Sequence, residues 1–360
     1  MFIWLLELKP WVHIIGGGLS GLSLAYALSQ SSKLPGDVVI SESRADYTND
    51  RTFSFWFDES QRDLLQPEYE SASWCLSQQT ETIQHHGREL KYGIRSATSV
   101  YQQALRAITA HPQISIHHQQ LKSQPDAEHV FDSRPPAVTD FRLIQSFVGT
   151  EVTLSKGHDL AAVQLMQNIT TTESGIEFRY VLPLETHKLL VEHTEFTSRA
   201  GDFDNLRAHN ITWLEQSFGQ RFQITREEKA HIPMGIKSAQ QHWGIPIGTR
   251  AGMTRAATGY GYATIIQWCH QAARSLVTSN HCVAYKTSAL YEQMDNIFLN
   301  LISKRPDTIP SILMQLARSL DADTFASFMM RTRLSDALRV IYHAPTKPFV
   351  YALLGRYEWI

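Results

Sequence analysis

Hydrophobic and polar positions in the first part of the chain follow the order of a strand, a turn, a helix and a second strand. A hydrophobic run over 12–15 breaks into three glycines, and the LSLAYAL segment that follows is typical of a buried helix. A second run covers 38–40 and ends just before Glu42. Residues 98–109 carry hydrophobic side chains at helical spacing. Further strands are expected at 111–117 and at 129–136, where the second ends in a proline stop. This pattern predicts an α/β fold.

Between 141 and 197 the pattern changes to a period of two, as in FRLIQSFVGTEVTL and KLLVEHTEFT. That alternation predicts an antiparallel sheet, followed by a helix near 205–216. A second strand, glycine loop and helix follow, with the helix over 263–277, and 289–354 is expected to be mostly helical. Because the β segment separates the two glycine loops, the nucleotide-binding domain is expected to be discontinuous. The expected divisions are a nucleotide-binding domain at 1–60, 95–136 and 235–285, an antiparallel substrate domain at 61–94 and 137–234, and a helical C-terminal extension at 286–360.

The first glycine turn has the G-x-G-x-x-G spacing of a dinucleotide site. In such a turn the first glycine permits a tight bend, the second lets the backbone approach a pyrophosphate, and the third allows close packing of helix and strand. Glu42 lies 21 residues past Gly21, where a carboxylate can accept the hydroxyls of an adenosine ribose. The alternative is a glycine-rich turn beside an exposed glutamate, but the order of elements favours the dinucleotide site. The candidates here are Gly16, Gly18, Leu19, Ser20, Gly21 and Glu42.

Composition narrows the classes of partner and site. The formal net charge of −2 argues against binding to nucleic acid through bulk electrostatics. Cys75, Cys269 and Cys282 are isolated, so they form neither a disulfide framework nor a C-x-x-C site, and a reducing compartment fits. The sixteen histidines show no H-x-x-x-H spacing, and no metal site is expected. The N-terminal FIWLL is too short for a membrane span or a secretory signal, and no long hydrophobic run occurs elsewhere.

The two glycine loops, together with several short motifs, resemble the FAD-dependent lycopene cyclase family of the bacterial β-cyclase type. The later loop reads GTRAGMTRAATGYGY, and RTFSFW, VFDSRP, QSFVG, FRYVLPL and LVEHTEFT occur in the family's order along nearly the whole chain. The resemblance implies a glutathione-reductase-like, FAD/NAD(P)-binding Rossmann-type domain, an antiparallel substrate domain and C-terminal helices, α+β overall. It also implies that the later loop lies against the flavin and its ribityl chain. The residues carried over to that loop are Gly248, Gly252, Met253, Thr258, Gly259 and Tyr260.

Three further candidates near the cofactor follow with less specific signals. The resemblance places Arg51 and Thr52 near the pyrophosphate or the adenosine, although an exposed arginine at the start of a strand is an equal alternative. Asp132 ends a strand near the expected cofactor, and its side chain could instead cap a turn. Phe53, Phe55, Trp56, Phe147, Tyr180 and Phe196 are expected to form sheet core, with some of them lining a polyene tunnel.

Glu192, in LVEHT, aligns with the family glutamate implicated as an acid. Periodicity alone favours an outward-facing strand residue, whereas the family position favours the acid. Glu195 is a rival that alternation places on the opposite face of the strand. His193 stands where the family has a second glutamate, and Gln167 stands where many members have an aspartate. As a hypothesis, His193 could pass a proton to Glu192, and both departures leave room for altered activity.

The resemblance implies redox-neutral cyclisation of the linear ends of lycopene to β-ionone rings, giving γ-carotene and β-carotene. The implied cofactors are FAD, active in its reduced form, and NAD(P)H as the reductant. One alternative is an FAD monooxygenase or prenyl reductase on the same scaffold, although these usually carry Gly-Asp where Thr249 follows Gly248 here. The other alternative is a carotenoid- or flavin-binding protein without turnover.

A carotenoid substrate implies contact with a lipid surface. Residues 303–347 carry seven Lys and Arg against four Asp and Glu, which suits an anionic membrane. The expected location is cytoplasmic, peripherally attached to the inner face of the cell membrane. The alternative is a helical cap whose apolar stripe packs on the core. That stripe consists of Phe325, Phe328, Met329, Leu334, Leu338 and Ile341.

Overall fold

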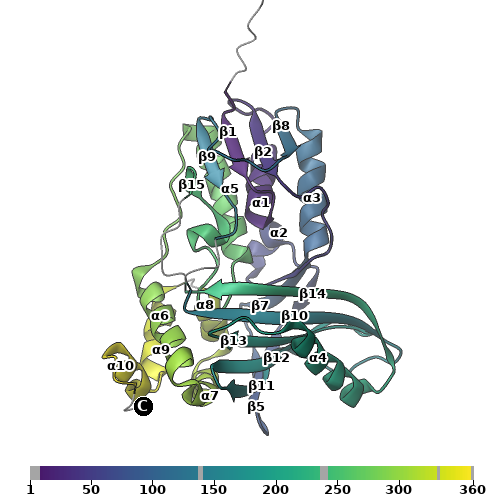
Figure 1. Ribbon diagram of the computed structural model, residues 1–360, viewed down its shortest axis with the longest axis vertical. Coiled ribbons are helices and arrows are strands. Elements are labelled where there is room, and N and C mark those ends of the chain that lie inside the picture. The colour runs from purple at the N-terminus through teal and green to yellow at the C-terminus, as the bar shows by residue number, and fades with distance from the viewer. Residues whose placement is uncertain (1–8, 137–140, 236–241, 331–332, 358–360) are drawn as a thin grey trace, which may run out of the picture.

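The computed structural model describes residues 9–136, 141–235, 242–330 and 333–357, and one end of it is built on a parallel sheet (Figure 1). The strand order is β15–β9–β1–β2–β8, and all four pairings are parallel. Both the strand, glycine turn and helix at the start and the helix over 98–109 are confirmed. The elements of this part are β1 (Val12–Ile15), α1 (Leu19–Ser29), β2 (Val38–Glu42), α3 (Ala97–Ala110), β8 (Ile114–His118), β9 (His129–Asp132), β15 (Ile245–Pro246), a 3-10 turn at Gly248–Ala251 and α5 (Tyr262–Ser279).

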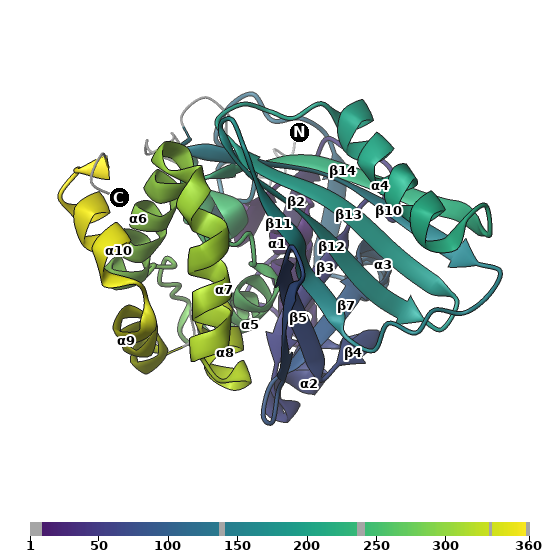
Figure 2. The same ribbon diagram turned by 90° about the horizontal axis from the view of Figure 1, so that it is seen from below.

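A seven-stranded sheet crosses beneath this part, in the order β14–β10–β13–β12–β11–β5–β6. Helix α4 (Phe203–Phe218) covers one face of it (Figure 2). The expected antiparallel pairing needs one correction, because β11 and β5 run parallel and the sheet is therefore mixed. The strands are β5 (Ser73–Gln78), β6 (Glu81–His86), β10 (Leu143–Leu154), β11 (Val163–Thr172), β12 (Gly175–Glu185), β13 (Lys188–Thr197) and β14 (Phe222–Met234).

Strand β14 has no counterpart among the sequence predictions. Its sequence FQITREEKAHIPM is rich in charge, which argues against a strand by the usual propensities. The strand lies at the edge of the sheet and pairs only with β10 among the described strands. Charged side chains are tolerated at such an edge, which explains why the pattern is uninformative.

A small three-stranded sheet, β3–β7–β4, lies between the two larger ones. Its elements are β3 (Thr52–Phe57), a 3-10 turn at Glu59–Gln61, α2 (Arg62–Leu65), β4 (Tyr69–Ser71) and β7 (Lys91–Ser96). The expected C-terminal helices pack beside the seven-stranded sheet (Figure 2). They are α6 (Ala289–Lys304), a 3-10 turn at Pro306–Thr308, α7 (Ile309–Ser319), α8 (Ala322–Met330), α9 (Leu334–His343) and α10 (Thr346–Leu353). The residue ranges given above for the nucleotide-binding domain, the substrate domain and the C-terminal extension stay a prediction.

The apolar stripe expected in a single helical stretch is divided between two helices. Phe325 is buried on α8, whereas Leu334, Leu338 and Ile341 on α9 are 58%, 62% and 50% exposed. In the described part of the chain, no helix is both long and apolar enough to cross a membrane. The N-terminal FIWLL lies outside the described residues.

Candidate active site

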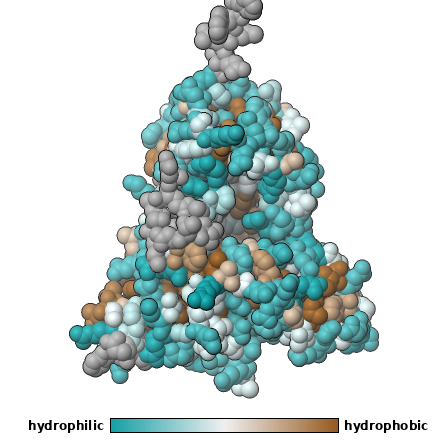
Figure 3. All heavy atoms as spheres, in the orientation of Figure 1, coloured by the Kyte–Doolittle hydropathy of each residue, from teal (hydrophilic) through white to brown (hydrophobic). Residues whose placement is uncertain are grey.

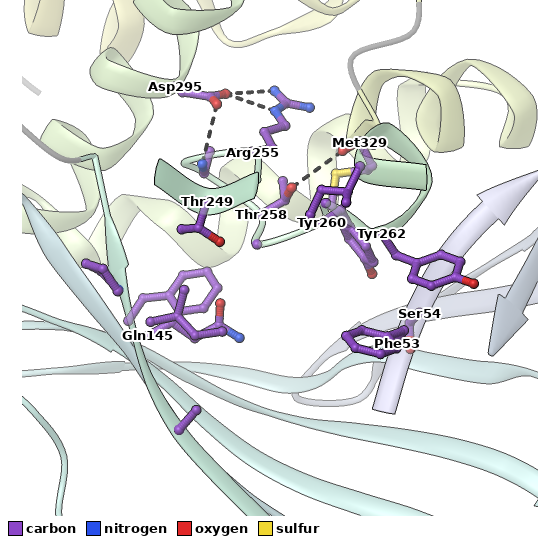
Figure 4. A pocket seen from close by; sticks show the side chains of 18 of the residues that line it. Phe53, Ser54, Gln145, Thr249, Arg255, Thr258, Tyr260, Tyr262, Asp295 and Met329 are labelled. Carbon is purple, nitrogen blue, oxygen red and sulfur yellow. Dashed lines mark hydrogen bonds and ion pairs between the residues drawn. The ribbon is translucent and has the colours of Figure 1, made fainter. Parts of the chain in front are cut away.

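A cavity of about 1620 Å³ runs from the first glycine turn to the C-terminal helices. One end is walled by the turn after β1 and by polar residues after β2. The middle lies between the later glycine loop and the inner face of the seven-stranded sheet, as the close view in Figure 4 shows. The other end is apolar and is lined by α6 to α10. The cavity is thus polar at the parallel sheet and hydrophobic at the helices.

The glycine turn has the shape that a pyrophosphate needs. Gly16 has a φ of +92°, which favours glycine, and a Cβ on Gly21 would lie 1.9 Å from the carbonyl oxygen of Gly16. A Cβ on Gly18 would meet no atom of the described residues within 4 Å, because this position opens into the cavity. Gly18 is also the N-cap of α1, and no side chain caps the helix there. The first amide groups of α1 are therefore left for an anionic ligand.

Glu42 lines the same end of the cavity and is only 9% exposed. Its carboxylate accepts hydrogen bonds from the backbone nitrogens of Gly17 at 2.5 Å and of Arg44 at 2.7 Å. Arg44, which the sequence motifs did not identify, also lines the cavity and lies over the ring of Tyr47 at 4.2 Å. The two hydrogen bonds fix the carboxylate at the cavity wall.

The later glycine loop is held by a buried ion pair that the sequence did not indicate. Arg255 and Asp295 are 3% and 2% exposed, and Nη2 of Arg255 lies 2.9 Å from Oδ1 of Asp295 on α6 (Figure 4). Asp295 also accepts from the backbone nitrogen of Ala257. Moving the loop away from α6 would break this pair and leave a buried charge without a partner. Because that is costly, the ion pair fixes the loop in place. No local motif could have revealed it, because the partners lie 40 residues apart.

The structure separates the loop candidates into two groups. Thr258, Gly259 and Tyr260 line the cavity, as do Gly16, Gly18, Leu19, Ser20, Glu42, Arg51 and Thr52. Gly248, Gly252 and Met253 lie behind the wall, as does Gly21 of the first turn, and support it. Gly248 and Gly252 have positive φ angles, and the sulfur of Met253 accepts from the backbone nitrogen of Gly248 at 3.2 Å.

Gln145 on β10 is a cavity residue that sequence reasoning missed. Its Oε1 is buried and has no hydrogen-bond partner among the described residues. The side chain faces Gly259, where an added Cβ would lie 2.9 Å from this oxygen, and Figure 4 shows it beneath the later loop. Buried acceptors normally receive a hydrogen bond, so this oxygen is open to a donor from a bound molecule or an ordered water.

Thr52 and Asp132 are engaged by protein groups. The hydroxyl of Thr52 donates to Glu228 on β14 at 3.0 Å, which joins the small sheet to the seven-stranded one. Asp132 is fully buried, pairs with Arg134 at 2.6 Å and accepts from the backbone nitrogen of Trp243. Asp132 does not line the cavity, so its geometry matches the turn-capping alternative. Arg51 is exposed and pairs with Asp50 at 3.3 Å.

Glu192 lies at the middle of the cavity wall on β13 and is 9% exposed. Burial raises the pKa of its carboxyl group to about 8, the hydroxyl of Thr194 opposes that rise, and the charge of Glu228 adds to it. The Thr194 hydroxyl donates to Glu192 at 2.5 Å. At neutral pH this carboxyl group therefore keeps its proton for most of the time. Because helices cover one face of the sheet and the cavity the other, alternation did not distinguish inside from outside here.

Tyr180 and Tyr260 line the cavity with Glu192, and Tyr92 behind them links their hydroxyl groups. The hydroxyl of Tyr92 is hydrogen-bonded to that of Tyr180 and, at 2.9 Å, to that of Tyr260. Tyr180 is the direct neighbour of Glu192 across β12 and β13. Burial raises the pKa of all three phenols well above the usual value, so they remain neutral. Of the aromatic candidates, Phe53, Phe147, Tyr180 and Phe196 line the cavity, whereas Phe55 and Trp56 belong to the core.

The two departures from the family pattern do not face the cavity. His193 follows Glu192 on the strand, so its side chain points to the opposite face and contacts His209 of α4. Gln167 on β11 is likewise absent from the cavity wall. Glu195 also lies outside it, as alternation along the strand predicts. The structure therefore does not bring His193 into a proton relay with Glu192.

The donor set fits FAD at the nucleotide end. The open position at Gly18, the uncapped start of α1 and the fixed carboxylate of Glu42 would hold the pyrophosphate and the ribose. The unpartnered Oε1 of Gln145 lies beside the loop expected to contact the flavin. The observations at Gly18, α1 and Glu42 come from this chain's own geometry, whereas the flavin contact of the later loop is implied by the family resemblance.

Comparison with solved structures shows that the chain shares its fold with a reductase-like protein, a flavin-dependent brominase and a monooxygenase. A geranylgeranyl bacteriochlorophyll reductase-like protein from Thermoplasma acidophilum is 12% identical, with a TM-score of 0.59, and the alignment covers 96% of this chain and 98% of that one. The flavin-dependent brominase Bmp2 is 10% identical, with a TM-score of 0.57 and coverage of 97% and 98%. At such identities the likeness establishes the fold alone, and it confirms the expected fold class.

Sequence comparison gives the family. A lycopene beta-cyclase from Pantoea ananas is 26% identical over 225 residues, which is 58% of this chain and 58% of that protein. A lycopene beta-cyclase from Paracoccus sp. (strain N81106 / MBIC 01143) is 29% identical over 124 residues, 32% of either chain. The chain thus spans less than two thirds of the curated relatives it matches. The family model described as "Lycopene cyclase protein" matches residues 12–354, and this chain belongs to the lycopene cyclase family.

Proposed function

We propose that this protein cyclises the linear ψ-end groups of lycopene to β-ionone rings, with no net oxidation or reduction. The observation that carries the proposal is Glu192, a protonated carboxyl group in the wall of a cavity that joins a dinucleotide turn to an apolar chamber. Family membership points to carotenoid cyclisation, and the apolar chamber suits a hydrocarbon chain. The nucleotide turn supplies the place for the flavin.

In this proposal Glu192 donates its proton to the terminal double bond of the substrate. A tertiary carbocation forms, the neighbouring double bond closes the ring on it, and the ring cation gives up a proton to the carboxylate left on Glu192, which yields a neutral isomer and restores the acid. The acid has to remain protonated until the substrate arrives, which its burial ensures. The buried rings of Tyr180 and Tyr260 offer π-faces to the cation and exclude water from it.

FAD in its reduced form, when bound, would place negative charge beside the cation, and NAD(P)H would serve as its reductant. Gly18, Glu42 and the amide groups at the start of α1 would hold the nucleotide part. Thr258, Gly259 and Gln145 would contact the flavin side. Negative charge fixed in a water-excluded site stabilises a cation far better than it does in water.

The non-catalytic alternative depends on His193 and Gln167. Neither side chain lies in the cavity wall, so neither replacement removes a group from the chamber in which Glu192 lies. The alternative of a monooxygenase or prenyl reductase shares this fold, and fold alone does not separate it from a cyclase. Oxygen-dependent consumption of NADPH coupled to product would favour the monooxygenase.

The function test uses the full chain with FAD, a reductant and lycopene in vesicles, without oxygen. We expect conversion to products with one or two β-rings, separated by chromatography, and no consumption of NAD(P)H in proportion to product. Omitting the reductant is the control and should stop conversion. Lycopene recovered unchanged from a preparation with flavin bound would contradict the proposal.

We further propose that α9 and α10 deliver the cavity mouth to a membrane. Leu334, Leu338, Ile341 and Tyr342 lie along one side of α9 and are 50% to 83% exposed. On α10 and just beyond it, Val350, Leu353 and Leu354 are 43% to 61% exposed. Ile341, Val350 and Leu353 also line the cavity, so the exposed apolar surface is continuous with the chamber. Hydrophobic side chains are visible on this side of the molecule in Figure 3.

Replacing Leu338 and Leu354 together with glutamate should weaken binding to anionic vesicles at least tenfold in a pelleting assay. Burying a leucine in an apolar phase is worth up to about 1.5–3 kcal/mol, and a tenfold change needs only about 1.4 kcal/mol. Neither residue lines the cavity, so flavin content should not change. Val283→Glu is the matched control, because Val283 is 66% exposed but lies away from α9 and α10. Equal pelleting of both variants would refute the membrane contact.

A further inference from the structure

We propose that Glu177, His193 and His209 form a binding site for a divalent metal ion of the zinc type. The three residues come from β12, β13 and α4 and meet on the face of the seven-stranded sheet that α4 covers. This face is opposite to the one that carries Glu192. The proposal is independent of the cyclase reaction, because none of the three residues lines the cavity.

The donor atoms converge as a metal site requires. Nε2 of His193 lies 3.3 Å from Oε2 of Glu177 and 2.9 Å from Nδ1 of His209. One potential ligand atom from each residue lies within 4.8 Å of the other two. Ligands about 2.0–2.2 Å from a tetrahedral zinc ion are separated by about 3.3 Å, so small side-chain movements would complete the geometry.

Hydrogen bonding within the protein satisfies this cluster incompletely. Nε2 of His193 faces a carboxylate oxygen and a second imidazole nitrogen at the same time. If this nitrogen carries a proton, that proton cannot point well at both partners. If the nitrogen is unprotonated, its lone pair repels the carboxylate. A cation between the three atoms would accept all three lone pairs together, which is the usual function of a His₂-carboxylate set.

The surroundings hold the candidate ligands in place. Thr170 donates to Oε1 of Glu177 at 3.1 Å and thereby orients the carboxylate. Asn210, the residue after His209, is buried and donates to the carbonyl oxygen of Val148 at 2.8 Å, which anchors this turn of α4 to the sheet. Such supporting hydrogen bonds orient ligands in known metal sites.

Two charged groups beside the cluster act in opposite directions on a bound cation. Arg179, on the strand beside His193, opposes it, although its guanidinium lies over the ring of Trp213 at 5.1 Å. Glu195 lies directly opposite Glu177 in the strand register and adds a second carboxyl group.

The expected role is structural. A metal ion bound here would connect α4 to β12 and β13, and His193 is the residue after Glu192 on β13. Binding should therefore raise the thermal stability of the chain without supplying a group to the chamber. Local spacing did not predict the site, because its members are 16 residues apart and only the packing of α4 brings them together.

The test uses the full chain freed of metal by a chelator and titrated with Zn²⁺ by calorimetry. We expect about one tight equivalent per chain, a raised unfolding temperature that a chelator reverses, and visible absorption bands from Co²⁺ at the same stoichiometry. The single variants His209→Gln and Glu177→Gln should each bind this zinc ion at least tenfold more weakly. Circular dichroism would verify that each variant is folded. His270→Gln is the matched control, since His270 is a half-buried helical histidine that packs on Tyr26.

Several outcomes would overturn the proposal. They are the absence of a tight equivalent, weak binding at several sites only, or equal binding by the His209→Gln and His270→Gln variants. Any of these would leave Glu177, His193 and His209 as a hydrogen-bonded cluster that fixes α4 to the sheet. Loss of metal binding without loss of cyclisation would still support the proposal, because the site lies outside the chamber.

Discussion

Replacing Glu192 with glutamine is expected to reduce cyclisation by a factor of about 10²–10⁴, the usual contribution of a general acid. Glutamine has nearly the shape of the protonated acid but has no proton of suitable acidity to give. The cavity wall, the tyrosines and the flavin position should be unchanged. The measurement is the initial rate of ring formation from lycopene in vesicles, at equal flavin content.

Glu195→Gln is the matched control for this result. Glu195 lies on the same strand three residues later and faces away from the chamber, so its replacement should leave most of the activity. It is also the rival candidate from sequence. Loss of activity in the Glu195 variant with retention in the Glu192 variant would reverse the assignment, and full activity in both would remove strand β13 from the proton step.

The Glu192→Gln variant should also differ from the wild type in how its free energy of unfolding depends on pH. Burial raises the pKa of Glu192 in the folded chain to about 8, far above the value of about 4.3 for an exposed glutamate. The folded state thus holds a proton that the unfolded chain loses, so wild-type stability falls as pH rises from about 4.5 to about 8. Glutamine does not titrate, and Glu192→Gln should become the more stable protein by a few kcal/mol at pH 8. Denaturant unfolding at pH 5 and pH 8 measures the difference.

The protonated form of Glu192 is also the form that can act. The rate of cyclisation by the wild type should therefore fall tenfold per pH unit once pH exceeds about 8. The fall in protein stability and the fall in cyclisation rate with rising pH therefore have the same cause, which is the ionisation of Glu192. A rate that stayed level up to pH 10 would contradict the role of this group.

Replacing Gly18 with valine is expected to abolish flavin binding while leaving the apoprotein folded. The side chain would enter the space beside the start of α1, where a Cβ meets no atom within 4 Å in the part of the chain that the structure describes and the pyrophosphate is expected. The backbone at Gly18 has a φ of −78°, so valine is tolerated without strain. Flavin absorbance per chain should fall sharply, with an affinity loss of tenfold or more, equal to about 1.4 kcal/mol. The unfolding temperature measured without FAD should not change.

Gly21→Ala provides the contrast within the same motif. A Cβ at Gly21 would lie 1.9 Å from the carbonyl oxygen of Gly16, so helix α1 would have to move away from β1. This variant should lower the unfolding temperature of the apoprotein as well as flavin binding. If Gly18→Val destabilised the apoprotein as strongly as Gly21→Ala, the open space at Gly18 would not be a ligand site.

Local sequence patterns predicted much of the end of the cavity at the first glycine turn. The glycines, the helix after them and Glu42 lie within a short segment whose spacing reflects local backbone requirements, and the structure places Gly16, Gly18 and Glu42 at the cavity. The part of the site around the later glycine loop and the tyrosine hydroxyls could not be predicted in the same way. Arg255 and Asp295 are paired across 40 residues, and the tyrosine hydroxyls at 92, 180 and 260 converge from three elements.

The sequence by itself determined the family, most of the order of the elements and the position of the first glycine turn, because these depend on short-range patterns within one chain, whereas strand β14 was missed. Only the tertiary structure decided which face of β13 is the chamber, that His193 faces α4, and that half of the C-terminal stripe is exposed beside the cavity mouth. The physical reason is that a strand covered on both faces has no solvent-exposed side, and β13 carries polar residues on each face, Glu192 on one and His193 on the other. Its pattern of hydrophobic residues therefore does not report which neighbours it will meet.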